Sequence, residues 1–264
     1  MNTVLAIHRA PCFSPNSVEK DRAIMAAVAD CLRQRGVQVV EVSELDVPIA
    51  EAEAYDCILS MGRFPETLQW LARQECPVVN RPQAVERCAR SVVERLAVQS
   101  GVPIAPADGA DGYWLKRGDA CAQEPGDVVY CANRAELALR QAEFRRRGIT
   151  DHVVCAHVSG DLLKFYGVRG TPFFRWFYPT DDGETKFGDE RRNGIARHYA
   201  FSAERLQADV HRLADALGLD VYGGDCIIRP DGTYCVIDFN DWPSFSRCRS
   251  EAAEQIAALT VRNK

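Results

Sequence analysis

The sequence predicts a mixed chain in which an open α/β lobe precedes two α+β lobes. Three observations support this fold class. Short apolar runs alternate with amphipathic helical stretches in the first third, the prolines of Gly101-Val-Pro-Ile-Ala-Pro106 mark a boundary, and strands dominate the remainder up to a closing hairpin. We therefore expect an N-terminal lobe over residues 1–102, a small lobe over 103–160 and a C-terminal lobe over 161–264.

The N-terminal lobe is expected to start with the strand Thr3–His8 and a helix over residues 17–35. Ser17 is suited to the N-cap of that helix, and Gly36 stands where a C-terminal glycine belongs. The pattern then predicts strands at 37–42, 56–61 and 77–80, and helices at 66–74 and 83–99. This order is typical of a small open sheet.

The two following lobes should be α+β. In the small lobe, strands are predicted at 113–116, 128–131 and 152–158, with a helix that begins at Asn133 and ends at Gly148. Asn133 and Glu136 form a pattern like a capping box. In the C-terminal lobe we predict strands at 162–168 and 173–178, helices at 202–217 and 250–259, and a final hairpin around the turn Pro230-Asp-Gly232.

Composition excludes several classes of function. The formal net charge of -5 over 264 residues argues against a general nucleic-acid binder, so any anionic partner must be recognised locally. No apolar run approaches the roughly 18 residues of a membrane span, and no export leader is apparent. The eleven cysteines are odd in number and lack CxxC spacing, which favours reduced thiols. We expect a cytoplasmic protein with no membrane partner.

The closing hairpin carries three oxygen-bearing side chains. Asp225 lies on its first strand, while Asp238 and Asn240, two residues apart, share one face of the second strand. Two carboxylates and an amide oxygen suit Mg²⁺, with nucleotide phosphates completing the coordination. The same residues could instead be solvated polar side chains at strand ends, and spacing alone leaves both interpretations open.

Lys116 ends the apolar strand Tyr113-Trp-Leu-Lys and would present one cation at its tip. Such a lysine suits a contact to phosphate, although an exposed surface lysine would give the same pattern. The sequence contains no GxxxxGK[ST] motif and no convincing GxGxxG motif, which argues against P-loop and Rossmann nucleotide sites.

The order of these motifs resembles the ATP-grasp enzymes from about Val79 to Ile256. The resemblance is carried by seven short segments: Val79-Asn-Arg-Pro82, Arg90 ahead of Gly101-Val-Pro103, Lys116, His152-Val-Val-Cys-Ala-His-Val158, Gly160-Asp-Leu-Leu-Lys164, Gly224-Asp225 and Ile237-Asp238-Phe-Asn240. Singly each segment is weak, whereas their order is specific.

The resemblance implies ATP and Mg²⁺ as cofactors, with adenine held between the two α+β lobes. Ala156 and Val158 would offer backbone groups to the base. The phosphates would contact Arg90 and Lys116, and Lys164 is assigned to the same nucleotide site. The implied metal ligands are Asp225, Asp238 and Asn240.

Two features depart from the usual family pattern. The segment after Lys116 contains only Gly118 and Gly126 where most members have a glycine-rich loop over the phosphates, and Arg117 could substitute for that loop. The closing motif is Asp-x-Asn instead of the commoner Glu-x-Asn. A shorter acid moves the metal-facing oxygen by about one methylene, which the backbone can absorb.

The acceptor is expected to be a small anionic molecule, because cations gather in residues 169–198. We assign catalytic roles to Lys186, Arg191 and Arg192, and substrate binding to Arg175, Arg197 and Ser244. The other interpretation is a solvated hairpin face in which these cations balance neighbouring acids. The oligomeric state is not predicted.

The resemblance favours a ligase that joins a small carboxylate to an amine through an acyl phosphate, since this is the family's prevalent chemistry. Asp238-Phe-Asn-Asp-Trp-Pro243 is similar to the Asp-x-Asn-x-x-Pro ending of ATP-grasp inositol phosphate kinases, so a kinase acting on a polyol or inositol phosphate hydroxyl is the second hypothesis. A non-catalytic nucleotide-binding module is the third, suggested by the missing glycine-rich loop.

Overall fold

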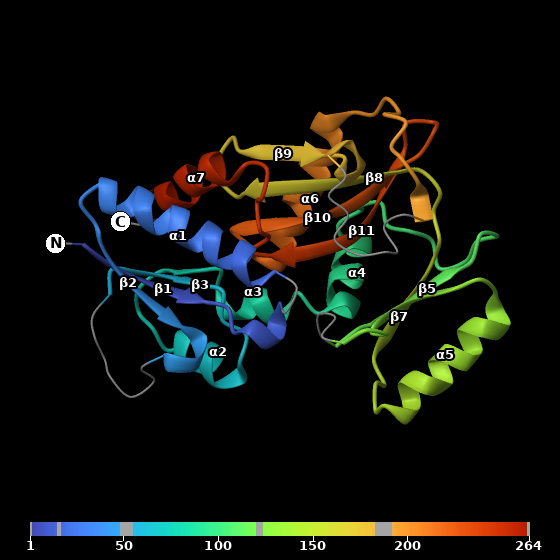
Figure 1. The fold of residues 1–264 in the computed structure, drawn as a ribbon, viewed down its shortest axis with the longest axis horizontal. Coiled ribbons are helices and arrows are strands. Elements are labelled where there is room, and N and C mark those ends of the chain that lie inside the picture. Colours follow the sequence, from blue (N-terminus) through green and yellow to red (C-terminus); the bar gives the residue numbers. More distant parts are fainter. Residues whose placement is uncertain (1, 15–16, 48–54, 120–123, 183–191, 263–264) are drawn as a thin grey trace.

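A computed structural model describes residues 2–14, 17–47, 55–119, 124–182 and 192–262. Within them the chain forms one parallel and two antiparallel sheets (Figure 1). The expected mixed α/β and α+β fold class is confirmed. No helix of the described part is long and apolar enough to cross a membrane.

The N-terminal sheet is parallel, with strand order β2-β1-β3-β4. Its strands are β1 (Thr3–His8), β2 (Gln38–Ser43), β3 (Cys57–Ser60) and β4 (Val78–Val79). Alternate residues of β1 enter different cores: Val4 and Ala6 pack with helix α1 (Val18–Gln34), and Leu5 and Ile7 pack with α2 (Pro65–Leu71). Both faces are covered, as the sheet's apolar strands require.

The last helix of the chain returns to the first lobe. α7 (Arg249–Arg262) packs against α1, and Ala252, Ala253 and Ile256 share a buried cluster with Ile24 and Val28. Figure 1 shows the two helices side by side, in red and blue. The buried cluster on the α1 side of the N-terminal sheet thus includes residues more than 200 positions away in the sequence.

The expected helix over residues 83–99 is wrong, because the structure contains two helices, α3 (Pro82–Glu86) and α4 (Arg90–Gln99). Ala89 between them is extended, with φ -57° and ψ 131°. Ser91 explains the break, since its amide donates to the Gly118 carbonyl at 3.2 Å and its hydroxyl to Asp151 at 2.7 Å. These tertiary contacts fix the start of α4 on the second sheet and override helical periodicity.

The second sheet has strand order β6-β5-β7 and is antiparallel. Its elements are β5 (Tyr113–Arg117), β6 (Val128–Cys131), α5 (Arg134–Arg146) and β7 (His152–Ala156). The Asn133 side chain caps α5 by accepting from the Glu136 amide at 3.0 Å, as the sequence predicts. Strand β7 ends two residues earlier than the predicted 152–158, which leaves His157 and Val158 as a connection to the third sheet.

The third sheet is antiparallel, in the order β11-β10-β8-β9. Its elements are β8 (Asp161–Val168), β9 (Phe174–Phe177), β10 (Val221–Ile228), β11 (Tyr234–Asp241) and the covering helix α6 (Ala203–Leu217). The predicted closing hairpin is confirmed as β10–β11. The described residues also include the short 3-10 helices Pro11–Phe13, Glu44–Asp46 and Pro179–Asp182.

Asn80 connects the N-terminal lobe to the third sheet. Its buried side chain accepts from the amides of Asp220 and Val221 at 2.7 and 2.8 Å and donates to the Val221 carbonyl at 2.7 Å. We expect Asn80→Leu to lower the free energy of unfolding by about 3 kcal/mol, because three backbone groups, two of them buried, lose their partners. Urea denaturation measures this change. As a control, Asn133→Ala removes one exposed helix cap and should lower the free energy of unfolding by about 1 kcal/mol. Equal losses in the two variants would contradict a stabilising role for the Asn80 hydrogen bonds.

Candidate active site

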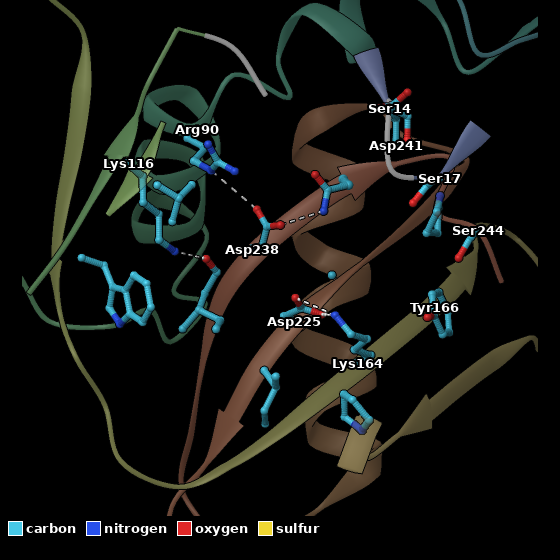
Figure 2. Close-up of a pocket in the computed structure, with 18 of the residues that line it drawn as sticks. Ser14, Ser17, Arg90, Lys116, Lys164, Tyr166, Asp225, Asp238, Asp241 and Ser244 are labelled. Carbon is cyan, nitrogen blue, oxygen red and sulfur yellow. Dashed lines mark hydrogen bonds and ion pairs between the residues drawn. The ribbon is translucent and has the colours of Figure 1, made fainter. Parts of the chain in front are cut away.

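One cavity of about 1050 Å³ lies where the three sheets meet. The second and third sheets supply most of its walls, and the N-terminal lobe closes one side. Figure 2 shows Arg90 and Lys116 on one side of this cavity, Ser14, Ser17 and Ser244 on the other, and Asp225 and Asp238 between them. Sequence-predicted site residues that line the cavity are Arg90, Lys116, Ala156, Val158, Lys164, Asp225, Asp238, Asn240 and Ser244.

The floor of the cavity is the β10–β11 ladder. Asp225 and Asp238 are directly paired across it, and a β-bulge follows Asp225. The Asn240 amide nitrogen donates to Asp238 Oδ2 at 3.0 Å, which leaves the amide oxygen of Asn240 as an acceptor. The structure thus brings together the three side chains that the sequence assigns to a metal.

Three cations surround these oxygens. Lys164 Nζ lies 3.1 Å from Asp225 Oδ1, and Arg90 Nε lies 3.8 Å from Asp238 Oδ1. Lys116 Nζ donates to the Ile237 carbonyl at 2.7 Å. Arg90 Nε is buried and has no hydrogen-bond acceptor, which is costly unless a further acceptor binds there. Three cations beside two carboxylates form a site suited to phosphate groups and a divalent cation.

The charge of Asp238 is maintained by its neighbours. Burial by itself would raise its pKa, but Arg90 and Lys116, with the hydrogen bond from Asn240, more than offset that effect and hold the pKa below its ordinary value. Asp238 is therefore ionised at neutral pH.

Glycine at position 224 is required by close packing at this floor. A Cβ atom there would collide with the Asp238 carbonyl oxygen and lie 2.6 Å from Phe165 Cζ. The absence of a side chain lets β11 approach β10 beside the metal-ligand candidates. Gly223 plays a similar part, since a Cβ there would lie 2.7 Å from Pro243 Cγ.

The side of the cavity near β7 is the more apolar one. Trp114, Cys155, Val158, Leu162 and Ile237 line it, and such a surface suits a flat base. The Ala156 amide donates to the Pro106 carbonyl at 2.7 Å, so only the carbonyl of Ala156 can serve a ligand. This narrows the role that the resemblance implies for Ala156.

His157 lies beside this wall and has a fixed tautomer. Trp114 Nε1 donates to His157 Nδ1 at 3.2 Å, which places any proton of the neutral ring on Nε2. Burial, followed by the charge of Arg192, lowers the pKa of His157, so the ring is neutral at pH 7.

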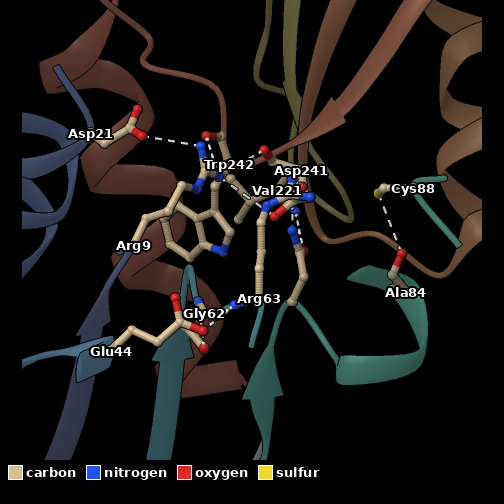
Figure 3. A network of polar contacts seen from close by, with 12 residues as sticks. Arg9, Asp21, Glu44, Gly62, Arg63, Ala84, Cys88, Val221, Asp241 and Trp242 are labelled. Carbon is tan, nitrogen blue, oxygen red and sulfur yellow. Dashed lines mark hydrogen bonds and ion pairs between the residues drawn. The ribbon is translucent and has the colours of Figure 1, made fainter. Parts of the chain in front are cut away.

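The N-terminal lobe contributes two arginines that the sequence interpretation missed. Arg9 and Arg63 both pair with Asp241, which is fully buried directly after Asn240 (Figure 3). Arg9 also lies 3.1 Å from Asp21 of α1. A signal existed: Arg9 follows β1 and Arg63 follows β3, and ligands of open α/β sheets gather at the carboxyl ends of the strands.

The segment after β11 has an unusual backbone. Trp242 and Phe245 are buried and adopt positive φ values of 42° and 48°, a conformation that costs non-glycine residues roughly 1–3 kcal/mol each. Both rings are fully buried, and Ser244 between them lines the cavity. Strain of this kind concentrates at functional sites.

Arg175, Arg192 and Arg197 do not line the cavity. Arg175 pairs with Glu251 at 2.5 Å, and Arg197 is an exposed residue whose Nη1 lies 3.4 Å from the Tyr199 hydroxyl. Arg192 stacks on the Tyr130 ring, 3.5 Å from its centroid, and is not a lining residue although its neighbour Asn193 is. Lys186 and Arg191 lie outside the described residues.

The residues present fit a magnesium ion that is shared with a nucleotide. Among the described residues, no group of three or more His, Cys, Asp or Glu side chains could hold a metal alone. Asp225, Asp238 and Asn240 supply two carboxylates and an amide, which is the partial set expected when phosphate oxygens provide other ligands.

Comparison with solved structures identifies the fold of the chain. The chain has the ATP-grasp fold, and solved structures with that fold align over its whole length. D-alanyl-alanine synthetase A from Vibrio cholerae has a TM-score of 0.72 at 10% identity and covers 99% of this chain and 98% of its own.

Two further solved structures give the same result. The RimK domain protein ATP-grasp from Sphaerobacter thermophilus has a TM-score of 0.67 at 16% identity, covering 99% of this chain and 100% of its own. A RiPP-associated ATP-grasp ligase from Chryseobacterium gregarium, in complex with ADP and a leader and core peptide, has a TM-score of 0.68 at 13% identity, covering 100% and 98%. No protein-family model and no curated protein sequence matches the chain.

Proposed function

We propose that the protein is an ATP-dependent ligase that joins a small carboxylate to an amine. The observation that carries this proposal is the grouping of Arg90, Lys116 and Lys164 around Asp225 and Asp238 on the floor of one large cavity. The names of the similar structures support it, since they include a synthetase and ligases, one of them holding ADP.

The chemistry needs no covalent protein nucleophile. A substrate carboxylate oxygen attacks the γ-phosphorus of ATP, the bond from that phosphorus to the ADP oxygen breaks, and an acyl phosphate and ADP form. The amine then attacks the acyl carbon, and phosphate leaves as the nitrogen loses a proton to solvent. Both steps redistribute negative charge on phosphoryl oxygens, and fixed cations accelerate such steps by electrostatic stabilisation.

The residues divide this work by position. Arg90 and Lys116 bind the phosphates from the side of the second sheet, and Lys164 balances charge from β8. Mg²⁺, when bound by Asp225, Asp238 and Asn240, would neutralise phosphate charge and align the γ-phosphoryl group. The wall of Trp114, Val158 and Leu162 excludes water from the base and strengthens these interactions.

A kinase is the second candidate, because the chain carries the Asp238-x-Asn-x-x-Pro243 pattern that resembles the inositol phosphate kinases. Pro243 of this pattern packs against Gly223 beside the cavity floor. In that reaction a hydroxyl oxygen of the acceptor takes the γ-phosphoryl group directly. The difference lies in the products, since a kinase releases no free phosphate.

The test is a product analysis with purified protein, ATP and Mg²⁺. Pools of carboxylic acids are supplied with and without pools of amines, and ADP, free phosphate and product masses are measured. The ligase predicts ADP, free phosphate and a condensation mass only when both pools are present. A gain of one phosphoryl group without free phosphate would replace the ligase with the kinase. Binding of ATP with no ADP from any pool would contradict both.

A further inference from the structure

The first turn of α1 faces the cavity with an unused hydroxyl. Ser17 occupies the N-cap position, yet its side chain makes no capping hydrogen bond. The residue is only 5% exposed, and its Oγ is buried with no hydrogen-bond partner. A buried hydroxyl without a partner is costly and calls for an explanation.

Ser202 provides a comparison within the same chain. It is the N-cap of α6, and its hydroxyl accepts from the Arg205 amide at 3.1 Å. This is the ordinary use of an N-cap serine. Ser17 has the same residue type at the same helix position, but its hydroxyl is left for another partner.

The place of Ser17 indicates what that partner is. Ser14, Ser17 and Lys20 line the cavity. Figure 2 shows Ser17 across the cavity from Arg90 and Lys116, with its hydroxyl on the side of Asp225 and Asp238, and Ser244 nearby. A group bound there would belong to the molecule that meets the nucleotide, because the phosphate-binding cations stand on the opposite side.

The electrostatic field at the start of α1 favours a negatively charged group. α1 has 17 residues, and its first backbone amides have no carbonyl partners within the helix, which gives its N-terminus a partial positive charge. The first turn also carries two acids, but each is paired with an arginine: Asp21 with Arg9 at 3.1 Å and Glu19 with Arg22 at 3.3 Å. Helix N-termini commonly bind anions through their backbone amides. Here the Ser17 hydroxyl and Lys20 add two further donors beside those amides.

We propose that the first turn of α1 is a subsite for an anionic group, a carboxylate or a phosphate, on the acceptor, with Ser17 Oγ and the amides of Val18 and Glu19 as donors. This inference rests on the proposed function for the identity of the bound molecule. It specifies an acceptor with two functional ends, one held at α1 and the other reacting above Asp225 and Asp238.

Backbone amide chemical shifts test the subsite without ATP or turnover. The isotope-labelled full chain is titrated with acetate, inorganic phosphate and, as a neutral control, acetamide. We expect saturable shifts at residues 17–20 with at least one anion and none with acetamide. Acetate alone would identify a carboxylate, and phosphate alone a phosphoryl group. The equivalent amides at the start of α6, where Ser202 already caps, should not saturate.

Matched variants then identify the donor. Ser17→Asp keeps a good N-cap residue but places a negative charge where the anion binds, so affinity at α1 should fall at least about tenfold. Ser17→Ala should weaken it several-fold by removing one donor, and Ser202→Asp should leave it unchanged. The subsite is overturned if α1 amides respond no more than those of α6, or if Ser17→Asp binds the anion as well as the wild type. Neither result depends on whether the protein is a ligase.

Discussion

Replacing Asp238 by asparagine is expected to lower Mg²⁺-dependent ATP turnover at least about 100-fold. The substitution keeps the size of the side chain and removes the charge that Arg90 and Lys116 stabilise. It also removes one of two carboxylates available to a cation at the β10–β11 floor. Initial rates of ADP formation at saturating ATP and varied Mg²⁺ measure the effect, and the Mg²⁺ requirement should rise as well.

A matched control is Asp215→Asn, since Asp215 is 65% exposed on α6 and pairs only at 3.5 Å with Arg169. Its turnover should stay within about twofold of the wild type, because exposed ion pairs contribute little. Thermal unfolding of both variants separates loss of chemistry from loss of fold. If Asp238→Asn turned over ATP at the wild-type rate, Asp238 would not be a metal ligand.

The second large effect is expected for Lys116→Met. Methionine keeps the apolar stem and removes the ammonium group that now donates to the Ile237 carbonyl. Loss of this cation, which we propose to contact the phosphates, should reduce kcat/KM for ATP about 100-fold or more. Steady-state kinetics and titration with ADP distinguish weaker nucleotide binding from a slower chemical step.

Arg117→Met is the control on the same strand. Arg117 is bound to Asp119 at 2.6 Å and does not line the cavity, so kcat/KM should change only a few-fold, provided that the variant remains folded. If Arg117→Met lost as much activity as Lys116→Met, the phosphate contact would belong to Arg117, the substitute that the sequence suggests for the missing glycine-rich loop.

Local patterns were sufficient to predict the floor of the site. Asp238 and Asn240 share a face because strand side chains alternate, and the Pro230-Asp-Gly232 turn fixes their strand opposite Asp225. No tertiary knowledge is needed for that step. The same alternation applies to Lys116, which lies one residue before the end of β5, the central strand of the second sheet.

Contacts between distant segments could not be predicted in this way. Arg175 was expected to bind substrate, but it alternates with the buried Phe174 and is held by Glu251, a residue of α7. Nothing in the neighbourhood of Arg175 in the sequence indicates that α7 folds back onto the first lobe. The sequence shows that cations are concentrated in residues 169–198, but it does not indicate which face of the sheet each side chain occupies.

The N-terminal side of the site was missed for a related reason. Arg9, Arg63 and Ser17 reach the cavity only because the parallel sheet docks beside Asp241 and Trp242. A serine before a helix normally caps it, and nothing in the sequence indicates that the Ser17 hydroxyl makes no capping hydrogen bond. The hydrogen bonds from Asn80 to Asp220 and Val221 are long-range contacts of the same kind.

The most direct test of the proposed ATP and metal site is a crystal structure with a non-hydrolysable ATP analogue and Mn²⁺, in which the ion is located by its anomalous scattering. We expect the base to lie against Ala156 and Val158, the phosphates to contact Arg90 and Lys116, and manganese to bind Asp225, Asp238 and Asn240. A nucleotide bound elsewhere, or manganese without contact to Asp238, would contradict this assignment.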